Sequence, residues 1–229
     1  MKITWLGQAG LLFETDGKKI LIDPYLSDFV KTVEPANYRR LPVDEGFLQI
    51  RPNVLICTHN HLDHLDRETL KHYLTEDAAC LVLAPNGGWQ ALREYKGNSN
   101  YVLFNAGTIW TEGRVTLRAV VAEHSDPYAI GVILSAEGRN YYVTGDTLYS
   151  ERVFDSLPDL PLKAVFLPIN GRGNNMNATD AAAFARRTGA TYAVPLHFGL
   201  FDDLDPHVFS HPRRVIPEIY QEIRLEDPL

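Results

Sequence analysis

The chain has 229 residues, of which 45% are hydrophobic and 22% are charged, and its formal net charge is −7. Composition and length are typical of one layered globular α/β domain, so residues 1–229 are predicted to form a single domain. The net acidity and the lack of a Lys or Arg block argue against a nucleic-acid partner. No apolar run could span a bilayer and no secretory leader is recognisable, so no membrane partner is expected and the predicted location is cytoplasmic.

Short strands joined by turns are predicted for the beginning of the chain. Their ranges are residues 1–5, 10–14, 18–22 and 54–58. Asp16-Gly17 is typical of a hairpin turn between the second and third of these strands. After Leu26 the sequence shows no clear period until Pro52, and a segment of this length in a compact domain is more often functional than idle.

Strands and helices alternate through the rest of the chain. Strands are predicted over residues 80–84, 101–104, 116–122, 130–135, 141–144, 164–168 and 192–196. Helices are predicted over residues 63–74, 89–95, 178–188 and 213–223. The helix over 178–188 is the best defined, because Asn177 can cap its start and Gly189 can end it.

Residues 59–64 read His-Asn-His-Leu-Asp-His directly after an apolar strand. In extended backbone, His59 and His61 project to the same side, so both can reach one metal ion. Asp63 and His64 fall where a helix is predicted to begin, and the helix dipole favours a carboxylate in the first turn. Three imidazoles and a carboxylate in six positions are a poor core and a good metal site.

Further ligand-type residues follow other predicted strands. His124, Asp146 and His197 each come within two residues of a strand end. Because the carboxyl ends of strands line one edge in α/β folds, these side chains can converge with His59. The sequence therefore predicts two sites of three or four nitrogen and oxygen ligands, each with a position open for water.

The two cysteines and the other histidines are not expected to bind metal. Cys57 and Cys80 lie in apolar strands and are expected to be buried thiols rather than a disulfide or metal ligands. His72, His207 and His211 fit no ligand pattern and are expected to be ordinary surface residues.

The sequence resembles the metallo-β-lactamase-fold hydrolases along essentially its whole length. The family's motifs occur in order: Asp23, His59-Asn60-His61-Leu62-Asp63-His64, His124, Asp146 in Thr144-Gly145-Asp146-Thr147, and His197. The implied fold is a four-layer αβ/βα sandwich of two mixed β-sheets flanked by helices. By this resemblance His59, His61 and His124 bind one metal, Asp63, His64 and His197 bind a second, and Asp146 bridges both. The resemblance also implies that Asp63 orients the attacking hydroxide and that Asp23 supports the ligands from behind.

A finer resemblance is to the L-ascorbate-6-phosphate lactonase group. It is carried by Asp23-Pro24-Tyr25-Leu26-Ser27-Asp28 and by Pro168-Ile169-Asn170-Gly171-Arg172. It implies a hydrolase that cleaves a lactone or ester of a small anionic, phosphorylated sugar-like substrate. Two divalent cations are implied; imidazole and carboxylate ligands suit Zn, Mn or Fe, with Mn favoured by the lactonase group and Zn by the superfamily.

Candidate substrate residues lie in two loops and one turn. Arg172, with Asn170 and Asn175, belongs to a Gly- and Asn-rich loop that can present a guanidinium to an anion, or that merely shapes a surface turn. Weaker candidates are Tyr38, Arg39 and Arg40, since paired Arg is usually a solvated face. Gln8, in the tight turn Gly7-Gln8-Ala9-Gly10, is expected to approach the site.

Two other functions remain open at this level. One is a phosphodiesterase on the same fold, and the other is a non-catalytic, metal-dependent sensor of a small anion. A homo-oligomer is likewise left open by the sequence.

Overall fold

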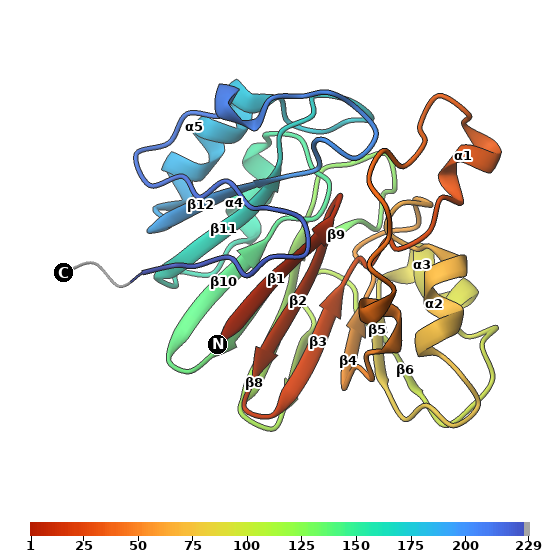
Figure 1. The fold of residues 1–229 in the computed structure, drawn as a ribbon. Helices are drawn as coiled ribbons and strands as arrows, with labels where there is room; N and C mark the ends of the chain where they lie inside the picture. Colours follow the sequence, from red (N-terminus) through yellow and green to blue (C-terminus); the bar gives the residue numbers. More distant parts are fainter. Residues whose placement is uncertain (227–229) are drawn as a thin grey trace.

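The computed structural model describes residues 1–226, and it consists of two mixed sheets that pack face to face with helices on the outside (Figure 1). The first sheet contains β1 (Lys2–Gly7), β2 (Gly10–Thr15), β3 (Lys18–Ile22), β4 (Val54–Ile56), β5 (Leu81–Ala84) and β6 (Asn100–Leu103). The second contains β7 (Ile109–Glu112), β8 (Val115–Val121), β9 (Ile130–Ala136), β10 (Arg139–Val143), β11 (Leu162–Pro168) and β12 (Tyr192–Leu196). The predicted αβ/βα sandwich is confirmed.

Each sheet is antiparallel at one end and parallel at the other. In the first sheet β1, β2 and β3 are antiparallel, and β3 to β6 are parallel. In the second, β7 to β10 are antiparallel, and β10, β11 and β12 are parallel. The parallel strands β4 and β5 read as continuous apolar runs because both of their faces are buried.

The main core lies between the two sheets. Phe13 of β2 packs edge-on against Phe166 of β11, with ring centroids 5.8 Å apart, and against Tyr141 of β10 at 6.2 Å. A second cluster lies on the other face of the first sheet, where Leu21 and Leu55 contribute to a core that includes Leu70 of α2. Both faces of the first sheet are therefore covered.

The helices and short helical turns flank this sandwich. They are α1 (Val30–Val33), η1 (Glu45–Gln49), α2 (Arg67–Tyr73), α3 (Asn86–Leu92), α4 (Glu151–Ser156), α5 (Ala178–Thr188) and η2 (Pro206–Val208). The helix predicted over residues 178–188 is confirmed. The Asn177 side chain accepts hydrogen bonds from the amides of Thr179 and Asp180, and Gly189 ends the helix at a φ of 68°.

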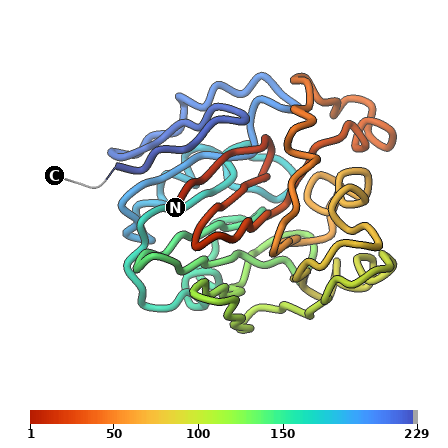
Figure 2. The backbone as a smooth tube through the Cα atoms, turned by 60° about the horizontal axis from the view of Figure 1, so that its bottom comes forward, coloured from red at the N-terminus to blue at the C-terminus, as the bar shows by residue number. Residues whose placement is uncertain are grey.

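Two predicted helices need correction. The helix predicted from Asp63 begins only at Arg67, where Asp66 caps it, so Asp63 lies in the preceding loop and not in a first turn. Residues 213–223 form no helix, and Pro217 inside this stretch accounts for that. Instead the stretch runs beside β1 (Figures 1 and 2), and the Tyr220 amide donates to the Trp5 carbonyl at 2.7 Å. It thereby covers a sheet edge that would otherwise be open.

Two further predictions concern thiols and membranes. Cys57 and Cys80 are both buried and unbridged, as predicted. Within residues 1–226, no helix has the length and apolar character that a membrane span requires.

Candidate metal centre

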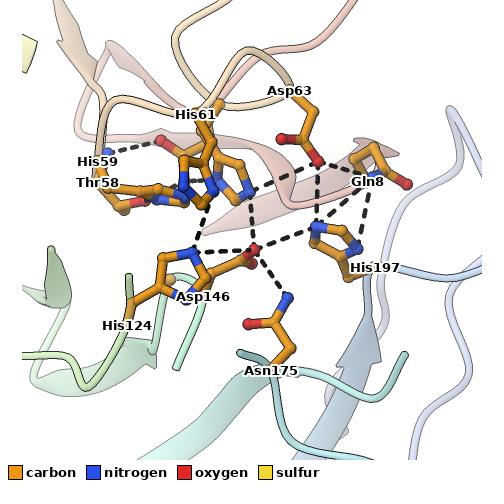
Figure 3. A network of polar contacts seen from close by, with 12 residues as sticks. Gln8, Thr58, His59, His61, Asp63, His124, Asp146, Asn175 and His197 are labelled. Atoms are coloured by element: carbon orange, nitrogen blue, oxygen red, sulfur yellow. Dashed lines mark hydrogen bonds and ion pairs between the residues drawn. The ribbon is translucent and has the colours of Figure 1, made fainter. Parts of the chain in front are cut away.

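Ligand-type side chains from four strand ends meet at one edge of the sandwich. His59 follows β4, His124 follows β8, Asp146 follows β10 and His197 follows β12. Figure 3 shows these side chains pointing toward one another, together with His61 and Asp63. The loops after the strands therefore gather residues that lie up to 138 positions apart (59 and 197) in the chain.

Two groups of ligand atoms can be distinguished. The first group is His59, His61, His124 and Asp146, and the second is Asp63, His64 and His197; the atoms within each lie no more than 4.8 Å apart. Asp146 lies between them, because its Oδ2 is 3.3 Å from His64 Nε2 and 3.9 Å from His124 Nε2. Asp23 also lies close to His59 and His64.

Asp23 organises two of the rings from behind. Its Oδ2 accepts from His64 Nδ1 at 2.7 Å and from the Thr58 hydroxyl at 2.6 Å, and its Oδ1 accepts from the Thr58 amide at 2.7 Å. Because the Thr58 hydroxyl donates to Asp23, it can accept the hydrogen of His59 Nδ1, which lies 3.0 Å away. Both rings are thus held by Nδ1 on the outside, with Nε2 toward the centre.

Two further rings have outer partners of their own. His124 Nδ1 lies 3.2 Å from the carbonyl oxygen of Asn174, which accepts its hydrogen. His61 presents Nδ1 to the centre, since its Nε2 contacts the Ser125 hydroxyl at 3.1 Å. An outer hydrogen bond of this kind orients a metal-binding imidazole and fixes its tautomer.

The atoms that face inward are those that a cation would satisfy. Among residues 1–226, His59 Nε2, His64 Nε2 and Asp146 Oδ1 are buried and have no hydrogen-bond partner. Buried polar atoms are rarely left without a partner, and a bound ion is one standard way to satisfy them. The residues therefore fit one or more divalent cations, and the nitrogen and oxygen donor set without thiolate suits Zn, Mn or Fe.

The buried charges perturb one another strongly. Burial alone disfavours a charged His197, but Asp146 and Asp63 more than offset this and raise the pKa of His197 to about 10. For His64 the same competition raises the pKa well above its ordinary value. Burial lowers the pKa of His59 well below its ordinary value, and the neighbouring imidazoles, His64 foremost, lower it further against the opposing effect of Asp146. Without metal, protonated imidazoles therefore offset the carboxylates at the centre.

Three residues of the centre have a left-handed backbone although none is glycine. The φ angles are 47° at Gln8, 46° at Asp23 and 60° at His197. The first and last are coupled, because the Gln8 carbonyl accepts from the His197 amide at 3.0 Å. Strained backbone of this kind concentrates at functional sites.

Comparison with known proteins identifies the family. Residues 18–198 match the beta-lactamase superfamily domain. The chain belongs to the beta-lactamase superfamily. It is 29% identical, over 91% of both chains, to the UPF0173 metal-dependent hydrolase of Geobacillus thermodenitrificans.

Two solved structures share the fold of this chain. Igni18, a metallo hydrolase from Ignicoccus hospitalis, superposes over 99% of both chains with a TM-score of 0.77 and 18% identity. The isothiocyanate hydrolase from Delia radicum gut bacteria superposes over 99% of this chain and 100% of its own, with a TM-score of 0.75 and 18% identity. These similarities support the fold of the superfamily member described here.

A cavity of about 450 Å³ opens over the metal centre of this superfamily member. Its polar wall carries four residues predicted to bind substrate: Gln8, Asn170, Arg172 and Asn175. Three of them also contact the centre. Gln8 Nε2 donates to Asp63 Oδ2 at 3.0 Å, Asn175 Nδ2 donates to Asp146 Oδ2 at 2.8 Å, and Asn170 Nδ2 lies 3.0 Å from His197 Nδ1.

The other predicted substrate residues lie elsewhere. The Arg39 guanidinium donates to the carbonyls of Tyr25 and Leu41 and to the Tyr220 hydroxyl, so it anchors its loop. Arg40 lines an adjoining cavity, where it forms an ion pair with Asp203. Tyr38 is exposed and lies outside the cavity over the centre.

Several residues of the site were not predicted from the sequence. Thr58 and Ser125 each adjoin a predicted histidine in the chain, which is the only signal that could have indicated them. The apolar wall of the cavity comes from Val30, Leu62 and Phe201. Leu62 lies inside the His-rich segment itself, whereas nothing in the sequence connects the other two with the centre.

Proposed function

We propose that this protein hydrolyses an ester or lactone bond in a small anionic substrate bound over the metal centre. Its enzyme class is a metal-dependent hydrolase of the metallo-β-lactamase superfamily. The observation that carries the finer proposal is the juxtaposition of the inward-facing ligand atoms with a cavity of small-molecule size that is lined by Arg172.

The ligand roles proposed here follow the two groups. One divalent ion would be held by His59, His61 and His124, and a second by Asp63, His64 and His197, with Asp146 shared between them. When bound, such ions polarise a substrate oxygen and lower the pKa of a bound water, which provides a nucleophile at neutral pH. Asp63 Oδ2 is engaged by Gln8, so its Oδ1 is the atom we assign to orienting the attacking water.

Arg172 is the charge in the cavity wall that favours an anionic substrate. Within the described residues, the Arg172 guanidinium has neither an ion pair nor a hydrogen bond, although it lines the cavity. Of the carboxylates that also line the cavity, Asp63 and Asp146 belong to the ligand groups. Glu34 accepts from Asn37 at 2.7 Å, and Asp202 accepts from two main-chain amides. Arg172 is therefore available to a phosphate or carboxylate, and a phosphorylated sugar lactone is one substrate of this kind.

Chelation tests the hydrolytic function. Protein stripped of metal by a chelator should lose turnover of chromogenic esters, lactones and phosphodiesters, and added Zn²⁺ or Mn²⁺ should restore it. Preference for the phosphodiester would favour a phosphodiesterase instead. Turnover that survives complete chelation would contradict the metal mechanism, and binding of metal without any turnover would favour an anion sensor.

The Arg172→Ala substitution tests the substrate class. Loss of a charged hydrogen bond of about 1.5–3 kcal/mol should raise KM for a phosphorylated lactone about 10- to 100-fold. KM for the unphosphorylated analogue should stay near the wild-type value. Arg67→Ala, which removes an exposed arginine paired with Glu94, is the matched control. Equal effects of Arg172→Ala on both substrates would contradict the assignment.

A further inference from the structure

The outer nitrogen of each imidazole at the metal centre should carry a hydrogen. A histidine that binds metal through one nitrogen is protonated on the other, and that hydrogen needs an acceptor. Four of the five rings have one: Thr58 Oγ1 for His59, Ser125 Oγ for His61, Asp23 Oδ2 for His64 and the Asn174 carbonyl for His124. The fifth ring, His197, differs.

The outer nitrogen of His197 faces the side-chain amide of Asn170 and not an atom that accepts. Its Nε2 faces the centre, 3.2 Å from Asp63 Oδ2 and 3.3 Å from Asp146 Oδ2. Its Nδ1 lies 3.0 Å from Asn170 Nδ2, an atom that can only donate. With metal on Nε2, the Nδ1 hydrogen and the amide hydrogens would point at each other. With the Asn170 amide oriented this way the Nδ1 hydrogen has no acceptor there, and Gln8 Nε2, 3.4 Å from the same nitrogen, is also only a donor.

The side chain of Asn170 also carries an acceptor that His197 could use. Its Oδ1 is buried and has no partner among residues 1–226. The two ends of an amide occupy nearly the same space, so half a turn of the side chain exchanges them without disturbing the packing. After that exchange Oδ1 faces His197 Nδ1, and no hydrogen bond between other residues is lost.

We propose that Asn170 is the positioning residue of His197: Asn170 Oδ1 accepts the Nδ1 hydrogen whenever His197 Nε2 binds metal. This inference rests on the metal site of the proposed function. It also connects the metal to the substrate subsite, because the loop of residues 170–175 contacts three candidate ligands. These contacts are Asn170 with His197, the Asn174 carbonyl with His124, and Asn175 with Asp146. Arg172 lies at the middle of this loop.

Calorimetric titration of Zn²⁺ into the metal-free full chain tests whether Asn170 accepts a hydrogen bond from His197 or donates one to it. Asn170→Leu, which has no acceptor, should bind one zinc ion about 10- to 100-fold more weakly than wild type. Asn170→Asp offers only acceptors, so it should restore affinity to within about threefold of wild type or exceed it. The matched control is Asn98→Asp, which adds the same charge on an exposed side chain that does not line the cavity over the centre; its zinc affinity should equal that of wild type.

Two outcomes would overturn the proposal. One is Asn170→Asp losing as much affinity as Asn170→Leu, because an amide donor would then be what His197 needs. The other is wild-type zinc affinity in Asn170→Leu. Absence of zinc binding by wild-type protein would instead contradict the proposed function.

A measurement on wild-type protein does not depend on the variants folding. Long-range proton–nitrogen NMR spectra of the histidine rings, recorded with zinc bound, should place the His197 hydrogen on Nδ1. A hydrogen on Nε2 would contradict both the proposed ligand role of His197 and the role of Asn170.

Discussion

The Asp23→Asn substitution should disturb both groups of the metal centre at once. Asn has the same shape as Asp and tolerates the left-handed backbone found here, so the fold should persist. The new amide oxygen can still accept from the Thr58 main-chain amide. The new NH₂ group, however, replaces the oxygen that accepts from His64 Nδ1 and from the Thr58 hydroxyl.

Reversing that one acceptor should reverse two tautomers. An NH₂ group at 2.7 Å donates to His64 Nδ1 and thus moves the ring hydrogen to Nε2. Donation to the Thr58 hydroxyl turns that hydroxyl toward His59 Nδ1, with the same consequence for His59. Each loss of an outer partner should weaken metal binding about 10- to 100-fold, or about 1.4–2.8 kcal/mol for each ion.

The assay is a zinc titration by calorimetry, with thermal unfolding of the metal-free protein as a check of the fold. Asp16→Asn is the matched control, because Asp16 also has a left-handed backbone, with a φ of 49°, but lies exposed in the turn between β2 and β3. Zinc affinity in Asp23→Asn equal to that of Asp16→Asn would refute the relay through Thr58. A loss confined to one ion would show that Asp23 orients only one of the two rings.

Two further predictions concern stability. A Cβ at Gly145 would lie 2.6 Å from a main-chain carbonyl oxygen, whereas one at Gly138 would have nothing within 4 Å, and both residues have positive φ. Gly138→Ala should therefore cost about 1–2 kcal/mol in urea unfolding and Gly145→Ala about 1–3 kcal/mol more; equal costs would contradict the steric argument. The ion pair with Lys18 joins the two sheets and lowers the pKa of Glu112 below its ordinary value of 4.5. This pair therefore stabilises the fold fully above pH 4.5, and the stabilisation is lost as the pH falls through the lowered pKa. Glu112→Gln should lower the urea midpoint at pH 7, and the difference from wild type should shrink as the pH falls below 4.5; a pH-independent difference would exclude this linkage.

The sequence predicted those parts of the fold that leave a local signal. Buried parallel strands such as β11 (Leu162–Pro168) are continuous apolar runs, and α5 (Ala178–Thr188) carries its own cap and stop. The missed strand β7 (Ile109–Glu112) lies at a sheet edge with residues that are exposed or half-buried, so no apolar run marks it. Residues 213–223 were wrongly predicted to form a helix because their apolar residues have helical spacing. In the structure this stretch covers the edge of β1.

The candidate ligands could be read from the sequence because they lie next to strand ends, and the family resemblance indicated Asp23 behind them. The other outer partners, Thr58, Ser125 and Asn174, could not be predicted. Asn174 contacts His124 across 50 positions, and Arg39 donates to Tyr220 across 181. Pairings at this separation depend on how the two sheets and the C-terminal stretch pack, which no local pattern reports. No local pattern therefore indicated that Arg39 anchors its loop.

The backbone at the centre indicates what determines metal affinity. Left-handed conformations at Gln8, Asp23 and His197 cost about 1–3 kcal/mol each, and they persist only where the surrounding fold fixes them. Here the Gln8 carbonyl is fixed by the Trp5 indole at 2.9 Å and by the His197 amide, both of which belong to the sandwich itself. The main chain therefore sets the positions of the ligands before any ion arrives. The outer hydrogen bonds can still differ in which partner donates and which accepts. Substitutions that exchange a donor for an acceptor there should therefore change metal affinity without moving a ligand.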